Sequence, residues 1–297
     1  MNILCRHVTR RQMITATGQA IAGFAFASSF APLFAAPEKR CFRIGSPDWS
    51  LGKAGDTAAL EVAKQIGLDG VQVSLGSLAN NMHLRRADIQ QQYKDAVQKY
   101  GIEIPSLGIG ELNNIPYKSD PRAIEWVSDS IDVMQALGVK VTLLAFFGKG
   151  NLKDDRAGVD EVVSRLKAVA PKAEKAGVVF GIESYLSADE HLDIIQRVGS
   201  SSVKVYYDVN NSIRQGYDIY KEIRRLGCQN ICEFHMKEKG ALLGQGLVDY
   251  KKVREAIDDI GYTGWIQIEE AVPKGVTIQE SYTANLKFLR DLFPGHV

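Results

Sequence analysis

The stretch from residue 178 to residue 208, VVFGIESYLSADEHLDIIQRVGSSSVKVYYD, decides the fold class of this chain. It begins with an apolar run that closes on Glu183, continues through a helical pattern near Asp189 to Val198, and returns to an apolar run that closes on Asp208. Both runs are nearly continuous rather than alternating, as expected for parallel strands covered on both faces. The stretch therefore predicts a strand–helix–strand unit with a carboxylate at the end of each strand.

The same unit recurs in both directions along the chain. Strands are expected at Cys41–Ser46, Gly70–Leu75, Ile102–Ile109, Val139–Phe147, Val178–Glu183, Val203–Asp208, Ile231–Lys237 and Trp265–Glu269, each followed by a helical pattern. Eight such units in about 255 residues match the usual size of a (β/α)8 TIM barrel, here one domain over residues 41–293. An open doubly wound sheet is the alternative, but the sequence offers no Gly-rich phosphate loop after an early strand.

The first 36 residues differ in kind from the rest. They contain Arg6, Arg10 and Arg11, no acidic residue, and a long uncharged stretch after Arg11. The segment TRRQMI at residues 9–14 resembles a twin-arginine export signal, so residues 1–36 are expected to be a cleaved signal peptide and the protein periplasmic or otherwise exported. A membrane anchor is the alternative, but several Gly and Ser residues dilute the apolar stretch, so we expect no stable membrane insertion after cleavage.

The charge balance limits the partners. Without the three arginines of the signal, 33 basic residues face 35 acidic ones, which gives a net charge of −2. Such a balance does not suit a nucleic-acid binder. We expect a small carbohydrate as the binding partner. The sequence leaves open whether the protein forms a homo-oligomer.

Four residues that can bind a metal close the last four predicted strands: Glu183, Asp208, His235 and Glu269. They lie roughly one βα unit apart, so in a barrel they meet at the end where barrel enzymes place their chemistry. Three carboxylates and one imidazole suit a single divalent ion, Mn²⁺ first, with Co²⁺, Mg²⁺ or Zn²⁺ as alternatives. Taken singly, each residue could be a helix cap, an ion-pair partner or a core residue. Their occurrence on four successive strands favours a site.

Five motifs resemble the xylose isomerase-like barrel superfamily, which includes ketose 3-epimerases, hydroxypyruvate isomerases and inosose dehydratases. They are GIES, YYDVNN, FHMKE, LGQGLVDY and IQIEE, and the similarity extends from Phe42 to Leu292. The resemblance implies that the four strand-end residues are the metal ligands. It also implies that Glu183 and Glu269 form the acid/base pair.

Lys237, two residues after His235, could neutralise charge that develops on a substrate, although a strand-end lysine paired with Glu238 or Glu270 is an equal alternative. By strand alternation Glu238 and Glu270 point away from the barrel axis, so we expect them at the surface or behind the ligands.

Further residues are candidates for substrate binding: Trp49, Gln72, Glu111 and Asn211. Trp49 could stack on a sugar face or plug the barrel mouth. The sequence reads Val209-Asn210-Asn211 where many epimerases have a His, and it lacks the Arg that often follows the FHMKE position. These departures leave a phosphorylated or free-ketose substrate unsupported.

Moving a carbonyl along a sugar, or inverting the carbon beside it, requires removal of a carbon-bound proton and stabilisation of the resulting enediolate. We therefore expect a metal-dependent isomerase or epimerase of a sugar or sugar derivative. One alternative is a metal-dependent lyase or dehydratase acting on a keto-sugar or a 3-keto glycoside. Another, of a different class, is a non-catalytic exported sugar-binding barrel.

Overall fold

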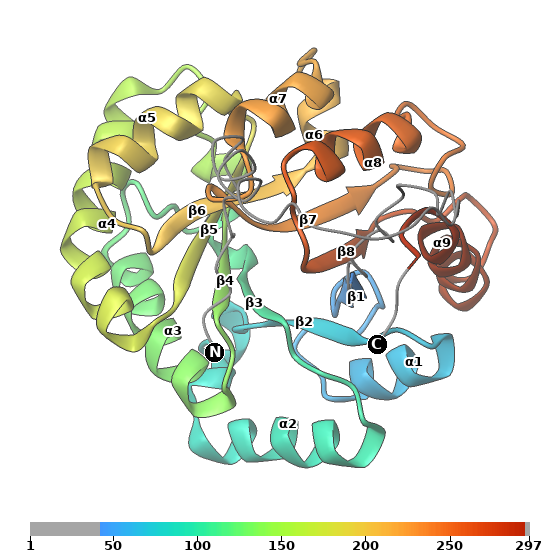
Figure 1. The fold of residues 1–297 in the computed structure, drawn as a ribbon. Coiled ribbons are helices and arrows are strands. Elements are labelled where there is room, and N and C mark those ends of the chain that lie inside the picture. Colours follow the sequence, from blue (N-terminus) through green and yellow to red (C-terminus); the bar gives the residue numbers. More distant parts are fainter. Residues whose placement is uncertain (1–41, 295–297) are drawn as a thin grey trace, which may run out of the picture.

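The computed structural model describes residues 42–294 as a closed barrel of parallel strands in sequence order, with β1 pairing to β8 (Figure 1). The strands are β1 (Arg43–Pro47), β2 (Gly70–Ser74), β3 (Ser106–Ile109), β4 (Val141–Phe146), β5 (Val179–Ser184), β6 (Val203–Asp208), β7 (Ile231–Lys237) and β8 (Trp265–Glu269). The predicted TIM barrel is confirmed. The predicted signal peptide lies outside the described residues.

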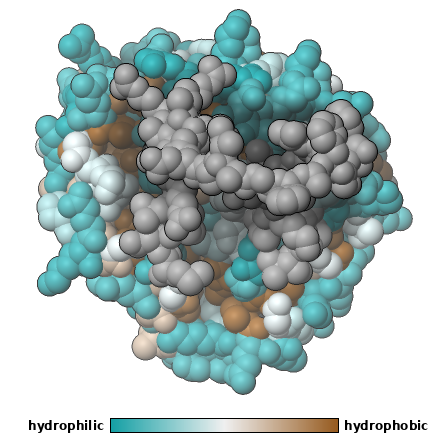
Figure 2. All heavy atoms as spheres, viewed as in Figure 1, coloured by the Kyte–Doolittle hydropathy of each residue, from teal (hydrophilic) through white to brown (hydrophobic). Residues whose placement is uncertain are grey.

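Helices surround the barrel and cover its outer face (Figure 1). They are α1 (Ala58–Ile66), α2 (Ala87–Tyr100), α3 (Pro121–Leu137), α4 (Arg156–Ala176), α5 (Ala188–Val198), α6 (Val209–Arg214), α7 (Ile219–Leu226), α8 (Tyr250–Asp259) and α9 (Ile278–Leu292). Around the rim of the face seen in Figure 2, most of the coloured side chains are hydrophilic. No helix between residues 42 and 294 is both long and apolar enough to cross a bilayer.

Two elements differ from the sequence-based expectation. Strand β3 begins at Ser106 rather than Ile102, because Pro105 has no backbone N–H for the ladder; Glu103 pairs only as an isolated bridge with Gly70. Helix α6 was not expected. It starts directly after β6 because the Asp208 carboxylate accepts the first free backbone N–H groups of the helix.

The barrel interior contains a buried polar network beneath the carboxyl ends of the strands. The buried Glu233 carboxylate accepts hydrogen bonds from Ser106 Oγ at 3.0 Å, Tyr206 OH at 2.8 Å and Gln267 Nε2 at 3.1 Å. Burial raises the pKa of Glu233, while these donors oppose the rise. The network joins strands β3, β6, β7 and β8, so it fixes the floor on which the site is built.

Candidate active site

The carboxyl ends of β5, β6, β7 and β8 bring four predicted residues together: Glu183, Asp208, His235 and Glu269. One possible ligand atom from each lies within 4.8 Å of the others, and all four side chains are buried. The register explains this convergence, because Asp208 pairs with His235 and Lys237 with Glu269 across adjacent strands. Side chains two residues apart on a strand point the same way, so His235 and Lys237 both face the barrel axis.

Helix α6 leaves one oxygen of Asp208 for another partner. Oδ1 accepts hydrogen bonds from the backbone N–H groups of Asn210 and Asn211, each at 2.8 Å. Oδ2 is buried and finds no hydrogen-bond partner among residues 42–294; Lys237 Nζ stands 3.6 Å away, beyond hydrogen-bond length. A buried carboxylate oxygen in this state is costly unless a cation meets it.

The imidazole of His235 is oriented from behind by Gln72. Gln72 Oε1 accepts from His235 Nε2 at 3.0 Å, and the amide group of Gln72 donates to the carbonyl of Leu107 at 3.4 Å. Nδ1 therefore faces Glu183 Oε1 at 3.1 Å and Glu269 Oε2 at 3.4 Å. With Nε2 carrying the donated proton, a second proton or a metal ion must lie between Nδ1 and these carboxylates.

Glu269 is held at both oxygens. Trp49 Nε1 donates to Oε1 at 2.9 Å, and Lys237 Nζ donates to Oε2 at 2.9 Å. Burial would raise the pKa of Glu269, but the charges of His235 and Lys237 and these two hydrogen bonds hold it well below its usual range. Glu183 is held less firmly than Glu269. The side-chain amide of Asn211 donates through Nδ2 to Glu183 Oε1 at 3.4 Å.

The cluster carries more negative than positive charge in a buried setting. Burial raises the pKa of Asp208 to about 8, opposed by the Lys237 ammonium and reinforced by Glu183 and Glu269. Burial would lower the pKa of His235, yet the facing carboxylates raise it to about 9. Oxygen-rich donors with one imidazole suit a divalent cation such as Mn²⁺, and Asp208 Oδ2, which has no hydrogen bond within residues 42–294, fits such an ion.

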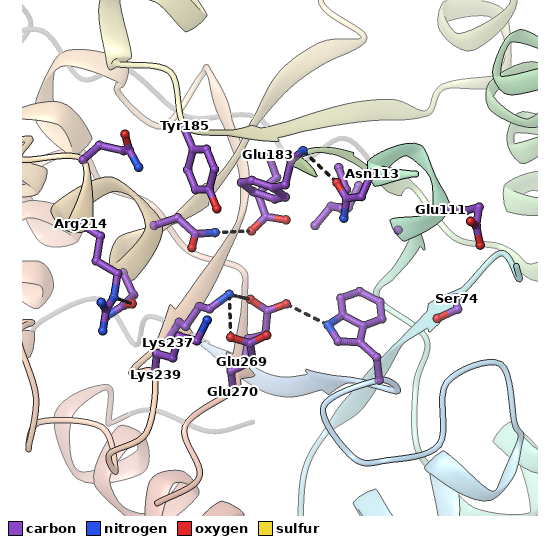
Figure 3. A pocket seen from close by; sticks show the side chains of 18 of the residues that line it. Ser74, Glu111, Asn113, Glu183, Tyr185, Arg214, Lys237, Lys239, Glu269 and Glu270 are labelled. Carbon is purple, nitrogen blue, oxygen red and sulfur yellow. Dashed lines mark hydrogen bonds and ion pairs between the residues drawn. The ribbon is translucent and has the colours of Figure 1, made fainter. Parts of the chain in front are cut away.

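A cavity of about 580 Å³ opens above the cluster at the carboxyl end of the barrel. Glu183, Lys237 and Glu269 project into it (Figure 3). Other polar side chains that line it come from the end of β2, from helix α6 and from the segments after β3, α6, β7 and β8: Ser74, Glu111, Asn113, Asn210, Asn211, Arg214, Gln215, Lys239 and Glu270. Such a mixture of acceptors and donors suits a polyhydroxylated ligand.

The predicted substrate-binding residues lie in different places. Trp49, Glu111 and Asn211 line the cavity. Gln72 is fully buried behind the His235 ring, so it positions that ring rather than meeting a substrate directly. Both oxygens of Glu111 also accept hydrogen bonds within the neighbouring loops, from Leu78 N and Asn114 Nδ2.

Glu238 lies behind the candidate ligands, the second of the two positions expected for it, and not at the surface. Its side chain is buried, because the loop between β7 and α8 folds over it and donates Leu247 N and Val248 N to its carboxylate. Asn210 Nδ2 also donates to it, at 3.1 Å. The LGQG sequence gave a signal for this arrangement, since a Cβ at Gly246 would collide with the Glu238 carboxylate.

Two further features of the cavity differ in how far they were predicted. The Lys237–Glu270 ion pair was one of the alternatives left open, but Glu270 lines the cavity rather than pointing away from the barrel axis. The aromatic pair of Phe147 and Tyr185 was not predicted. Glu270 adopts a left-handed backbone conformation (φ 49°) and forms an ion pair with Lys237 Nζ at 3.3 Å. Phe147 and Tyr185 form an aromatic pair with ring centroids 4.7 Å apart, and both line the cavity. All three stand one residue beyond a strand end.

Comparisons with known proteins agree with this architecture. The model of the family described as "Xylose isomerase-like TIM barrel" matches residues 60–292. The chain is 24% identical over 177 residues to the 2-epi-5-epi-valiolone 7-phosphate 2-epimerase of Actinoplanes sp., covering 59% of this chain and 65% of that protein. It is 22% identical over 256 residues to the D-psicose 3-epimerase of Enterocloster bolteae, covering 79% of this chain and 82% of that protein.

Among solved structures, the D-psicose 3-epimerase of Clostridium cellulolyticum H10, determined with D-tagatose, superposes with a TM-score of 0.72. The sequences are 21% identical, and the match covers 84% of this chain and 99% of that one. These curated relatives are sugar epimerases, which supports an isomerase or epimerase enzyme. Because the family model spans most of the barrel, the chain belongs to the xylose isomerase-like TIM barrel family.

Proposed function

We propose that the protein is a divalent-metal-dependent epimerase or isomerase of a sugar or sugar derivative. The observation that carries the proposal is the pair of buried glutamates, Glu183 and Glu269, that flank His235 Nδ1 at the base of a polar cavity. The names of the curated relatives support the reaction class. Mn²⁺ is the proposed ion, with Co²⁺, Mg²⁺ or Zn²⁺ as alternatives, because the donors are mainly oxygens.

Glu183, Asp208, His235 and Glu269 would hold the ion. When bound, it would lower the barrier to deprotonation next to a carbonyl by drawing negative charge toward the substrate oxygens.

The protein's own groups handle the proton. Glu183 takes it from the substrate carbon, because its carboxylate faces the cavity with fewer restraints than Glu269. Glu269, fixed by Trp49 and Lys237, stands on the other side of His235 and returns a proton to the opposite face or to the neighbouring carbon. The Lys237 ammonium lies beside Glu269 and Asp208, where it offsets negative charge that develops on the substrate.

Solvent exchange tests this proposal. The purified protein, loaded with Mn²⁺, is incubated in D₂O with a panel of ketoses, inososes and 3-keto sugars, and deuterium in recovered sugar is measured by mass spectrometry. The wild type should incorporate deuterium at carbon. Glu183→Gln should reduce incorporation by about a thousandfold or more, since the base is lost.

Glu190→Gln is the matched control. It makes the same chemical change seven residues away, in a capping box with Ser187 where glutamine serves equally well. Equal incorporation by wild type and Glu183→Gln, or none with any sugar, would contradict the proposal. The mass of the product distinguishes the lyase alternative from an epimerase, because elimination lowers the mass of the sugar and epimerisation leaves it unchanged.

Export through the twin-arginine route is also part of the proposal. It rests on Arg10 and Arg11 within the TRRQMI segment. Replacing both by Lys should leave the protein in the cytoplasm, as measured by cell fractionation. Unchanged periplasmic recovery would refute this part.

A further inference from the structure

The cavity continues one strand step beyond the metal-binding residues. Ala145 on β4 pairs with Glu183 on β5, so both lie at the level of the cluster. Phe147 and Tyr185 each stand two residues further along, roughly 7 Å away in the strand direction at about 3.3 Å per residue, on the side toward the barrel mouth. Their rings pack edge to face at 4.7 Å and 61°. Figure 3 shows the Tyr185 ring beside Glu183, pointing into the cavity.

The two walls of this upper part differ in chemistry. The wall at β4 and β5 is apolar, with Leu143 and Ala145 below the aromatic pair. The wall formed by α6 and the segment after β7 is polar and carries Arg214 and Lys239. A flat aromatic surface opposite hydrogen-bonding side chains suits a sugar ring, which presents C–H groups on its faces and hydroxyls at its edge.

The volume exceeds what one sugar requires. The cavity measures about 580 Å³. A hexose has twelve non-hydrogen atoms and fills on the order of 200 Å³ at the packing density of organic crystals. A single ring seated on the glutamates would therefore leave the space beside Phe147 and Tyr185 to water.

We propose that Phe147 and Tyr185 form a subsite for a second sugar ring, so that the substrate is a keto-sugar bearing a glycosidic substituent rather than a free ketose. The proposal rests on the proposed function, because the reacting ring occupies the level of Glu183 and Glu269. The second ring lies one step higher, against the aromatic pair. Neither Phe147 nor Tyr185 takes part in proton transfer.

Matched substrates test the subsite. Deuterium exchange by the Mn²⁺-loaded protein is compared for D-fructose and for three disaccharides that contain fructose substituted at different hydroxyls: lactulose, turanose and isomaltulose. At least one disaccharide should have a kcat/KM tenfold or more above that of D-fructose. Phe147→Leu and Tyr185→Leu should each lower that value by up to about tenfold through KM, because the flat contact face is lost. D-fructose should change less than twofold.

The substitutions keep the local backbone contacts, since Phe147 donates through its N–H to Asn113 and Tyr185 accepts through its carbonyl from Tyr217. Tyr100→Leu, on α2 outside the barrel, is the control for loss of an aromatic ring. A preference for D-fructose, or equal losses for both sugar classes, would overturn the subsite.

A binding measurement tests the subsite independently of the proposed function. If no sugar exchanges deuterium, the proposed function fails, and calorimetry with the unreactive alcohols lactitol and sorbitol decides the subsite. Tighter binding of lactitol than of sorbitol, weakened by Phe147→Leu and Tyr185→Leu, supports it. Equal binding of the two alcohols, or binding that the variants leave unchanged, overturns it.

Discussion

The two halves of the barrel mouth are built for different purposes. Strands β5 to β8 end in the four side chains that form the candidate metal site. At the end of β1, by contrast, the buried Asp48 carboxylate is fully used within the protein, since it accepts from Gly55 N, Ser74 N and Ser74 Oγ. A buried carboxylate at a strand end is therefore not by itself a ligand. What distinguishes Asp208 is an oxygen that none of residues 42–294 hydrogen-bonds.

The pair Asp208→Asn and Asp48→Asn tests this difference with one chemical change in each half. Asp208→Asn should remove metal-dependent stabilisation and lower turnover by at least about a hundredfold, because an ion ligand is lost. Asp48→Asn should lower the free energy of unfolding by about 1–3 kcal/mol, through hydrogen bonds that an amide cannot accept at both positions. It should still gain about 2.7 kcal/mol at an Mn²⁺ concentration a hundred times Kd.

Thermal and urea denaturation with and without Mn²⁺ measure the stability of both variants, and deuterium exchange into sugar measures turnover. The comparison fails if Asp48→Asn loses the stabilisation by Mn²⁺ while Asp208→Asn keeps it. Loss in both variants would mean that the two halves are not separable.

Trp49, like Gln72, joins the first half of the barrel mouth to one of the candidate ligands. Its indole N–H binds Glu269, and its six-membered ring lies over Gly108, where a Cβ would approach within 2.9 Å. Trp49→Phe keeps an aromatic ring over Gly108 but removes the donor. We expect about a tenfold fall in kcat with metal affinity changed less than threefold, because a hydrogen bond to a charged group is lost. Steady-state kinetics and Mn²⁺ titration are the measurements; an unchanged kcat would show that the bond does not position Glu269.

His191 provides the most local test, as an imidazole of the second half outside the candidate metal cluster. Its Nδ1–H donates to Ser187 O at 3.0 Å, so Nε2 accepts from Ser184 Oγ at 2.9 Å in the neutral ring. Burial lowers its pKa to about 4, which the Ser187 carbonyl and Glu190 only partly oppose. Because the folded pKa lies below the unfolded value, this contribution to stability is complete above about pH 6.5 and is lost as pH falls toward 4.

His191→Gln should therefore lose less stability than the wild type between pH 7 and pH 4, by up to about 3 kcal/mol. Urea denaturation at pH 7 and at pH 4 gives the loss of stability for each protein. Subtracting one loss from the other removes the contribution of the other titrating groups, which both proteins share. Parallel losses in the two proteins would rule out a neutral buried His191.

The sequence predicted the barrel and the convergence of the four strand-end residues because both follow from periodicity. Apolar runs at regular spacing specify parallel strands, and the last residue of each run specifies the position at the mouth. Periodicity could not place Trp49 against Glu269, 220 residues away, since that contact depends on the missing side chain at Gly108.

Loops account for the remaining differences. Strand alternation predicted that the Glu238 side chain points away from the barrel axis. It could not predict the loop between β7 and α8 that covers this side chain. The pattern could not predict the cavity walls either. Phe147, expected to end its strand, lies one residue beyond β4, and Tyr185 lies one residue beyond β5. Their shared level is set by the register of β4 and β5, which only the structure supplies.

Anomalous diffraction from crystals grown with Mn²⁺ tests the central claim most directly. The account predicts one anomalous peak at the mouth of the barrel, within about 2–2.6 Å of one atom each from Glu183, Asp208, His235 and Glu269. Asp208 should contribute Oδ2, the oxygen left without a hydrogen bond by residues 42–294. A peak elsewhere, or none at this position with Mn²⁺ in excess, would contradict the account.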